Sequence, residues 1–183
     1  QDGSFGKKLK TLSAELPSDA SSFANSAPFQ GHYAFGLENG SVVLVAPKFL
    51  VTFPNNERKL TPRLDYPLGK MALEVDEQGA AIKRFAFSHY EDKTAVVALT
   101  EDKRVLFSSF VAEENMFTGE VEWVVERTEL NIEGRVDELL ISPDTTRTFV
   151  RSANQIYVYD TRYPSEVEQI QLLSANEESA NLV

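Results

Sequence analysis

Two histidines are the only imidazole groups in the chain, and they lie far apart in the sequence. His32 and His89 each stand beside a tyrosine, and neither belongs to an HxH, HExxH or DxH pattern. A histidine can act as a general acid or base or as a metal ligand, but it needs partners at suitable spacing to do either. We interpret both as surface or capping residues, and we predict no metal site.

Carboxylates are plentiful, with 28 Asp and Glu in 183 residues. Glycosidase-type catalysis requires two carboxyl groups that face each other across a cleft, one of them kept protonated by burial. No pattern selects such a pair, and neighbouring acids such as Glu113 and Glu114 would point to opposite faces of a strand. We interpret these acids as solvated surface, and no calcium loop of the D-x-D-x-D-G type is present.

Other catalytic chemistries lack their residues. The chain has no cysteine, no G-x-S-x-G nucleophile elbow and no glycine-rich phosphate loop. A thiol nucleophile, a Cys-ligated metal and a disulfide framework are therefore excluded, and neither a serine hydrolase nor a nucleotide-binding protein is supported. The sequence predicts a protein that is not an enzyme and carries no cofactor.

Basic residues gather in one proline-rich segment, residues 53–69 (FPNNERKLTPRLDYPLG). Its three prolines remove backbone donors and hold the chain extended, which predicts a long ordered loop or an edge segment. Loops of this length are often functional. The candidate contact surface is Arg58, Lys59, Arg63 and Tyr66.

The charge balance limits the partners. Eighteen Lys and Arg against 28 Asp and Glu give 18 − 28 = −10. Such a surplus repels nucleic-acid phosphates and anionic lipid headgroups at long range. No run of about 18 apolar residues is present, so we expect that this segment does not span a membrane.

The elements that would position these residues are strands. Apolar residues recur at spacing two or in short β-branched runs, rather than at helical spacing. Residues 33–37 and 41–45 flank Asn39-Gly40, a dipeptide suited to a type I′ hairpin turn. Further strands are predicted at 82–88, 94–99, 104–107, 120–127, 136–142, 147–151, 156–160 and 167–173.

These strands repeat one plan. Each unit reads strand, polar turn, strand, short turn, strand, longer turn, strand, and Ser88 and Ser142 occupy equivalent places. This is the four-stranded meander of a β-propeller blade, although sandwiches and barrels also alternate strands and turns. We expect an all-β, propeller-like fold (WD40-like or YVTN-like) with about three four-stranded antiparallel blades. Because closed propellers need about four to eight blades, either the ends supply a fourth sheet or the chain is an arc of a larger propeller.

The length predicts one domain over residues 1–183. The chain begins with Gln and ends in a small, polar stretch, 174–183 (SANEESANLV), typical of a tail or linker. We therefore expect a fragment of a longer protein.

A family resemblance gives the most specific expectation. The segments YAFGLENGSV (33–42), VTFPNNER (51–58), TPRLDYPLG (61–69) and EEN with TGE (113–120) resemble the extracytoplasmic domain of long bacterial ABC transporter permeases of the phosphate-uptake type. The similarity covers roughly residues 20–170 and is most specific in FPNNER…TPRLDYPLG.

The resemblance implies a non-catalytic periplasmic domain of an inner-membrane permease, acting as an interaction or regulatory module in phosphate import. Its implied partners are the permease's own transmembrane domain and the periplasmic solute-binding protein. Two alternatives remain: a free-standing propeller-like protein-binding scaffold, and a propeller-type hydrolase or lyase.

Overall fold

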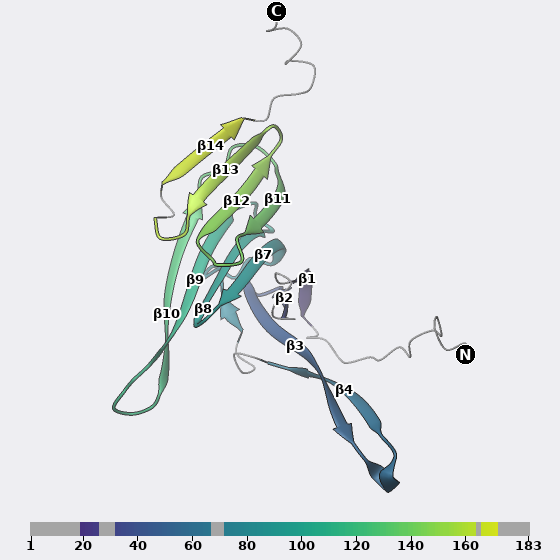
Figure 1. Ribbon diagram of the computed structural model, residues 1–183. Helices are drawn as coiled ribbons and strands as arrows, with labels where there is room; N and C mark the ends of the chain where they lie inside the picture. The colour runs from purple at the N-terminus through teal and green to yellow at the C-terminus, as the bar shows by residue number, and fades with distance from the viewer. Residues whose placement is uncertain (1–18, 26–31, 67–71, 164–165, 172–183) are drawn as a thin grey trace, which may run out of the picture.

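The protein is built from strands that form three antiparallel sheets, and none of the sheets closes on itself. The structure is a computed structural model that describes residues 19–25, 32–66, 72–163 and 166–171 (Figure 1). This result confirms the all-β prediction. The polar tail expected at 174–183 lies outside the described residues. No helix in the described part of the chain is long and apolar enough to cross a membrane.

Each sheet is made from consecutive strands. The first has the order β1-β2-β3-β4, with β6 paired to β3; the second runs β7-β8-β9-β10 and the third β11-β12-β13-β14. The strands of the first sheet are β1 (Ala20–Asn25), β2 (Tyr33–Leu37), β3 (Ser41–Thr52), β4 (Lys59–Asp65) and β6 (Leu73–Glu74). Those of the second are β7 (Ile82–Tyr90), β8 (Lys93–Thr100), β9 (Val105–Glu114) and β10 (Val121–Leu130). Those of the third are β11 (Val136–Ile141), β12 (Arg147–Ser152), β13 (Gln155–Asp160) and β14 (Val167–Gln171).

The predicted hairpin at Asn39-Gly40 is present, but its turn type differs from the expectation. A type I′ turn needs a positive φ at two residues, whereas here Gly40 (φ 79°) has one and Asn39 does not. The Gly40 amide donates to the Leu37 carbonyl at 3.4 Å. This hydrogen bond closes the turn one residue earlier than a two-residue turn centred on Asn39-Gly40 would. The connection is therefore the three-residue kind, in which a left-handed glycine follows a type I turn.

The repeat expected from the sequence appears in the geometry of the second and third sheets. β7 begins at Ile82 and β11 at Val136, and 136 − 82 = 54. Each of these strands has a register shift two residues into the strand, between Ile82 and Arg84 in β7 and between Val136 and Glu138 in β11.

The segment 53–69 is only partly the loop that its prolines predict. Residues 54–56 form a single 3-10 turn, η1 (Pro54–Asn56), and residues 59–65 form strand β4 at the end of the strand order of the first sheet, so of the two predicted forms the edge segment holds for 59–65 and a continuous loop does not. Among the described strands β4 pairs only with β3, and an edge strand tolerates Pro62 because the missing N–H can face solvent. Residues 67–69 lie outside the described part.

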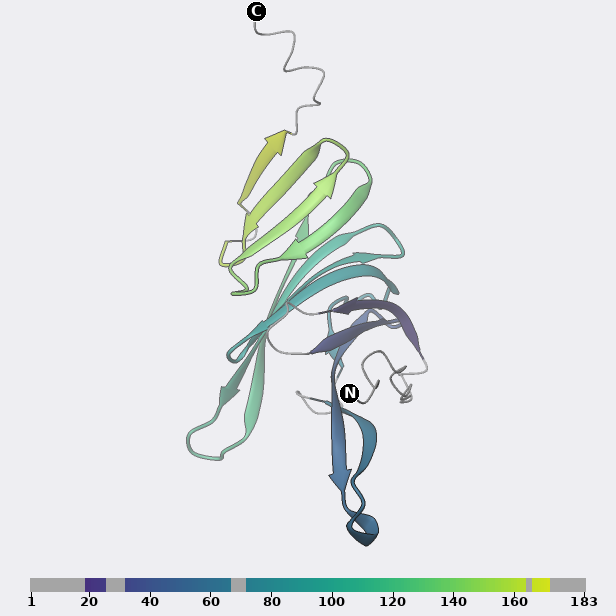
Figure 2. The ribbon, with the colours of Figure 1, turned by 45° about the vertical axis from the view of Figure 1, so that its right-hand side comes forward.

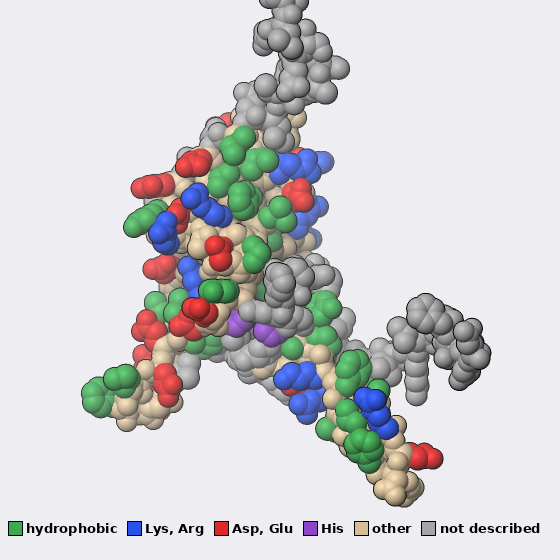
Figure 3. All heavy atoms as spheres, in the orientation of Figure 1, with side chains coloured by type: hydrophobic (Ala, Val, Ile, Leu, Met, Phe, Trp, Pro, Cys, Tyr) green, Lys and Arg blue, Asp and Glu red, His purple; other side chains and the backbone are tan. Residues whose placement is uncertain are grey.

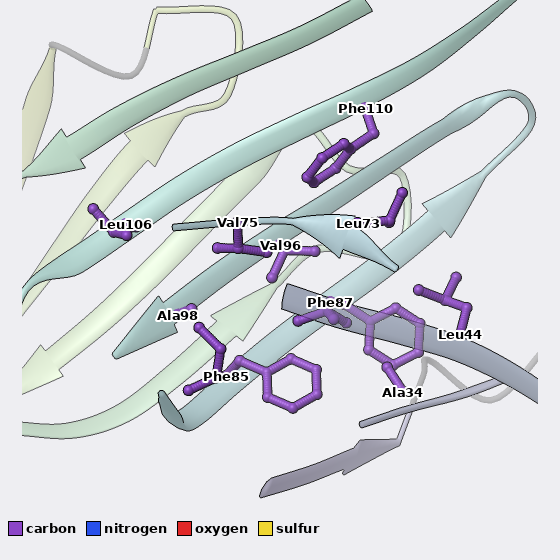
Figure 4. Close-up of a cluster of buried hydrophobic side chains, with 12 residues drawn as sticks. Ala34, Leu44, Leu73, Val75, Phe85, Phe87, Val96, Ala98, Leu106 and Phe110 are labelled. Atoms are coloured by element: carbon purple, nitrogen blue, oxygen red, sulfur yellow. The ribbon is translucent and has the colours of Figure 1, made fainter. Parts of the chain in front are cut away.

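Most of the core lies between the sheets, in two clusters that share the second sheet, and a smaller third cluster, which contains Val43 and Val45, lies on the other face of the first sheet. Along β8 the side chains alternate: Val96 and Ala98 face the first sheet, and Ala95 and Val97 face the third. Figure 4 shows the first cluster, where Leu44 and Ala34 of the first sheet meet Phe87 of the second. Figure 2 shows the resulting stack of sheets.

Side chains also join the sheets by polar contacts. Ser88 Oγ donates to the Pro143 carbonyl at 2.8 Å, which ties the second sheet to the third. Arg127 of β10 donates to the Glu74 carbonyl at 3.0 Å and pairs with Glu77 at 2.9 Å, which ties the second sheet to the first. These contacts help to hold the three sheets in place relative to one another. They therefore also help to set the direction of the two long hairpins, β3–β4 and β9–β10.

Candidate interaction surface

Strands β3 and β4 extend beyond the first sheet as a two-stranded ribbon (Figures 1 and 2). β2 accompanies β3 only as far as Val45, and from Ala46 to Thr52 the partner of β3 is β4. We call residues 47–65 the basic arm.

The register of the basic arm gives it two different faces. Phe49 stands opposite Pro62 and Val51 opposite Leu60, whereas Lys48 stands opposite Arg63. Because alternate residues of a strand point to opposite faces, one face is apolar and the other is polar and basic.

Solvent reaches the apolar face. Phe49 is 56% exposed and Phe53, directly after β3, is 64% exposed; Leu60 is also exposed. Contiguous exposed apolar side chains on a charged protein are typical of a surface that contacts a partner or a ligand.

Positive charge is concentrated on this arm. Residues 47–65 hold four basic and two acidic residues, 4 − 2 = +2, so the rest of the chain carries −10 − 2 = −12. Lys48 and Arg63 both pair with Asp65, at 2.8 and 2.9 Å, and the hydrogen bond from Lys48 is the main reason that the pKa of this carboxyl is lowered. Arg58 and Lys59 make no ion pair with any described residue, so they remain available to a partner.

The structure brings together three of the four residues predicted as a contact surface. Arg58, Lys59 and Arg63 all lie exposed on the basic arm. Tyr66 follows β4 at the root of the arm, where it is half-buried against the cluster that contains Val43 and Val45. It helps to anchor the arm rather than extend its surface.

The apolar residues of β3 were missed from the sequence. The alternation of Phe49, Val51 and Phe53 with Lys48 and Thr52 carried the signal. A half-buried strand has the same alternation of apolar and polar residues. Only the register and the exposure of the side chains therefore show that this apolar face is uncovered.

A second hairpin projects from the same end of the molecule. β8 accompanies β9 only as far as Val111, and beyond it β9 pairs with β10 alone. At its turn Met116 is 93% exposed and Phe117 98% exposed. Asn115 Oδ1 accepts from the amides of Phe117 and Thr118, at 2.9 and 3.2 Å, which holds the turn closed. We call residues 112–122 the acidic arm.

The acidic arm has the opposite charge. It holds four glutamates and no basic residue, a net charge of −4: Glu113, Glu114, Glu120 and Glu122. Glu113 stands directly opposite Glu122 in the register, and like charges in that position repel. None of the four makes an ion pair with a described residue. Figure 3 shows the two arms, with green and blue side chains on the basic arm and green beside red on the acidic one.

The two histidines, distant in sequence, are brought together at the body of the molecule. Their ring centroids lie 5.6 Å apart, and His89 Nδ1 lies 2.8 Å from Thr94 Oγ1. Burial lowers the pKa of both rings; Lys48 adds to the effect on His32, and His32 adds to the effect on His89 against the opposing influence of Asp92. Within the described ranges, no group of three or more His, Cys, Asp or Glu is placed to hold a metal ion.

Among the described residues the most deeply buried carboxylate is that of Asp76, and all of its hydrogen bonds are structural. It is 2% exposed, accepts the amides of Gln78 and Ala80 at 3.1 and 2.7 Å, and is bound by both terminal nitrogens of Arg104. Burial alone would raise its pKa, but these hydrogen bonds outweigh it and lower the pKa. With its acceptors occupied, this group has no lone pair directed at a substrate.

No protein-family model matches the chain, and no curated protein matches it either. The exposed apolar and charged side chains of the two arms are therefore the features of the structure that point to a function.

Proposed function

We propose that the protein is a non-catalytic interaction module with a propeller-like arc as its scaffold. The three successive sheets support the scaffold, because each is a meander of consecutive strands and the first strands β1, β7 and β11 lie against one another in that order. The recurrence of strand start and register shift after 54 residues supports a repeat.

The observation that carries the interaction role is the basic arm. A two-stranded ribbon with an exposed apolar face costs stability in an isolated molecule, and it gains free energy when a partner covers it. Arg58 and Lys59, which form no ion pair with a described residue, lie at the tip of the arm and would orient the partner, because charges at the rim of an interface give specificity more than affinity.

The biological setting we propose is the periplasmic domain of a phosphate-type ABC transporter permease, acting as an interaction or regulatory module in phosphate import. The sequence resemblance supports it, and its most specific stretch, residues 53–69, contains the tip loop and β4 of the basic arm. In that setting the domain is held by its own transmembrane part, and the periplasmic solute-binding protein is the partner to test.

A binding measurement tests this role. The 183-residue chain is titrated with the phosphate-binding protein of the same genome, with and without phosphate. We expect binding that weakens at least tenfold in Val51→Glu/Leu60→Glu, and that is unchanged in Leu140→Glu, a similarly exposed leucine on the third sheet. Equal binding by all three proteins would reject the arm as the contact surface.

Two further measurements test the setting. Calorimetry with inorganic phosphate should show no tight binding, because the chain has a net charge of −10, and micromolar binding would reject the interaction-only role. Reading the coding sequence on both sides of residues 1 and 183 should show apolar segments of about 20 residues, followed by permease-like segments. A signal peptide before the domain and an early stop after it would instead favour the free-standing scaffold.

A further inference from the structure

The basic and acidic arms are complementary to each other in both charge and polarity. The basic arm has a net charge of +2 and an exposed apolar face, whereas the acidic arm has a net charge of −4 and an exposed apolar tip. The two arms are therefore opposite in charge, and each has exposed apolar side chains that the other arm would cover.

Within one molecule the two arms stand apart. They project from the same end of the body but from its two sides (Figures 1 and 2). No ion pair of the described residues joins them. The contact that would satisfy them has to be made between molecules.

Each arm also holds like charges opposite each other across its two strands. Lys48 stands opposite Arg63 on one arm, and Glu113 stands opposite Glu122 on the other. Like-charged cross-strand pairs destabilise a hairpin, and a layer of opposite charge relieves the repulsion. Asp65 supplies part of that relief on the basic arm, but no cation among the described residues supplies it on the acidic arm.

We propose that two copies of this chain associate through their arms, the basic arm of each lying against the acidic arm of the other. A twofold axis between the arm ends produces both contacts at once, because it exchanges the two sides of the molecule. Such an interface is isologous and closes at two copies. Phe117 and Met116 would cover part of the apolar face of the facing ribbon, and Glu113 and Glu122 would meet Arg58 and Lys59.

This inference uses the proposed function only in taking the arms as contact surfaces, and it does not depend on the permease setting. An anionic membrane fits the pair of arms less well, because the four glutamates beside Met116 and Phe117 would be repelled by its headgroups.

Sedimentation velocity on the 183-residue chain, from 5 to 200 µM, tests the proposal. We expect a concentration-dependent dimer whose dissociation constant rises at least tenfold between 50 and 500 mM NaCl, since exposed ion pairs are screened by salt. Phe117→Ser should weaken the dimer by a similar factor, because it removes an apolar contact. The control Glu166→Lys/Glu168→Lys, at exposed positions of the third sheet, makes the same change in net charge as the reversal Glu113→Lys/Glu122→Lys on the acidic arm, and it should leave the dimer unchanged.

Charge reversal is the decisive part of the test. Arg58→Glu/Lys59→Glu changes the basic arm from +2 to −2 (2 − 4), so both arms are then acidic, and Glu113→Lys/Glu122→Lys changes the acidic arm from −4 to 0 (−4 + 4) and sets two lysines against Arg58 and Lys59. Each variant alone should therefore be monomeric. Mixed in equal amounts, the two variants should form a heterodimer, because both contacts then join opposite charges. A misfolded variant could not be rescued in this way, so the mixture separates loss of contact from loss of fold.

Three outcomes would overturn the proposal. The first is a chain that stays monomeric at 200 µM, and the second is a dimer that neither reversal affects. The third is a monomer that floats with vesicles containing phosphatidylglycerol but not with neutral ones. If the reversals abolish binding of the phosphate-binding protein and leave the oligomeric state unchanged, self-association fails while the proposed function stands.

Discussion

Asp76 is the residue at which the first two sheets meet through charge. Its carboxylate binds Arg104, whose side chain is 17% exposed, so a substitution leaves a guanidinium without its main counter-charge. Breaking one partner of such a pair costs about 3–5 kcal/mol. We expect Asp76→Asn to lose about this much in the free energy of urea unfolding at pH 7.

The control is Asp102→Asn, which removes the more exposed carboxylate bound to the same guanidinium and should cost no more than about 1 kcal/mol. Because the pKa of Asp76 is lowered on folding, its contribution is present above the ordinary value of the unfolded chain and is lost as the pH falls through the lowered value. The Asn variant should lack that part of the acid dependence. Equal losses from Asp76→Asn and Asp102→Asn would contradict the role given to burial.

His32 and His89 predict a second pH dependence, in the range below about 6.5. Folding lowers the pKa of both rings, so between the lowered value and 6.5 the unfolded chain binds protons that the folded chain does not. The free energy of unfolding should therefore fall when the pH is lowered from 7.5 to 5.5. His32→Asn/His89→Gln should show a smaller fall, and an identical fall in both proteins would contradict the assignment.

The pairing of these histidines shows what sequence reasoning could not reach at the residue scale. Neither residue carries a local motif, and their positions differ by 57 residues (89 − 32). They meet because β2 and β7 belong to neighbouring sheets, which is a consequence of tertiary packing. The same holds for Asp76 and Arg104, since nothing in the spacing of charges identifies a buried pair.

At the scale of elements, Gly36 sets how closely the first two sheets approach. It lies in β2, and a Cβ added there would stand 2.8 Å from the Cβ of Ile82 and would also meet Ser22 Oγ. Ile82 is fully buried, and its carbonyl accepts from Ser21 and Ser22 at 2.8 Å. We expect Gly36→Ala to destabilise the protein by about 1–3 kcal/mol through overpacking, measured by thermal or urea unfolding.

A larger side chain at the same position extends that test. Gly36→Val should be worse than Gly36→Ala, because its two extra methyl groups enter the same space between β2 and β7. A Gly36→Ala protein as stable as the wild type would mean that the sheets can separate without cost.

The strands themselves were largely predictable, and their ends were not. The periodicity placed every strand of the second and third sheets, yet it ended β9 at Phe107, whereas the strand continues to Glu114. Ser108 and Ser109 interrupt the apolar run, but both are buried, and Ser108 Oγ donates to the Val75 carbonyl at 3.3 Å. In the sequence, two serines after an apolar run indicate the end of a strand. The continuation of β9 into the acidic arm was therefore not predicted.

At the scale of the whole molecule, the described residues form a row of three sheets in which the two large buried clusters join only neighbouring sheets. The first cluster joins the first and second sheets, and the second cluster joins the second and third. In such quasi-one-dimensional arrangements, stability is a sum of unit and interface terms, so one end can open before the other. Separate opening of one end distinguishes a row of sheets from a single cooperative core, and hydrogen exchange can measure it.

Leu139 and Leu44 lie in the two different clusters and provide reciprocal tests. Each Leu→Ala substitution should cost about 2–5 kcal/mol, because each leucine is buried. By hydrogen exchange, Leu139→Ala should lower the protection of β12 and β13 far more than that of β2, and Leu44→Ala should do the reverse. β8 contributes to both clusters, so both variants should weaken its protection. If either variant lowered protection equally in β2, β8 and β12, the three sheets would unfold as one cooperative unit and the row description would be wrong.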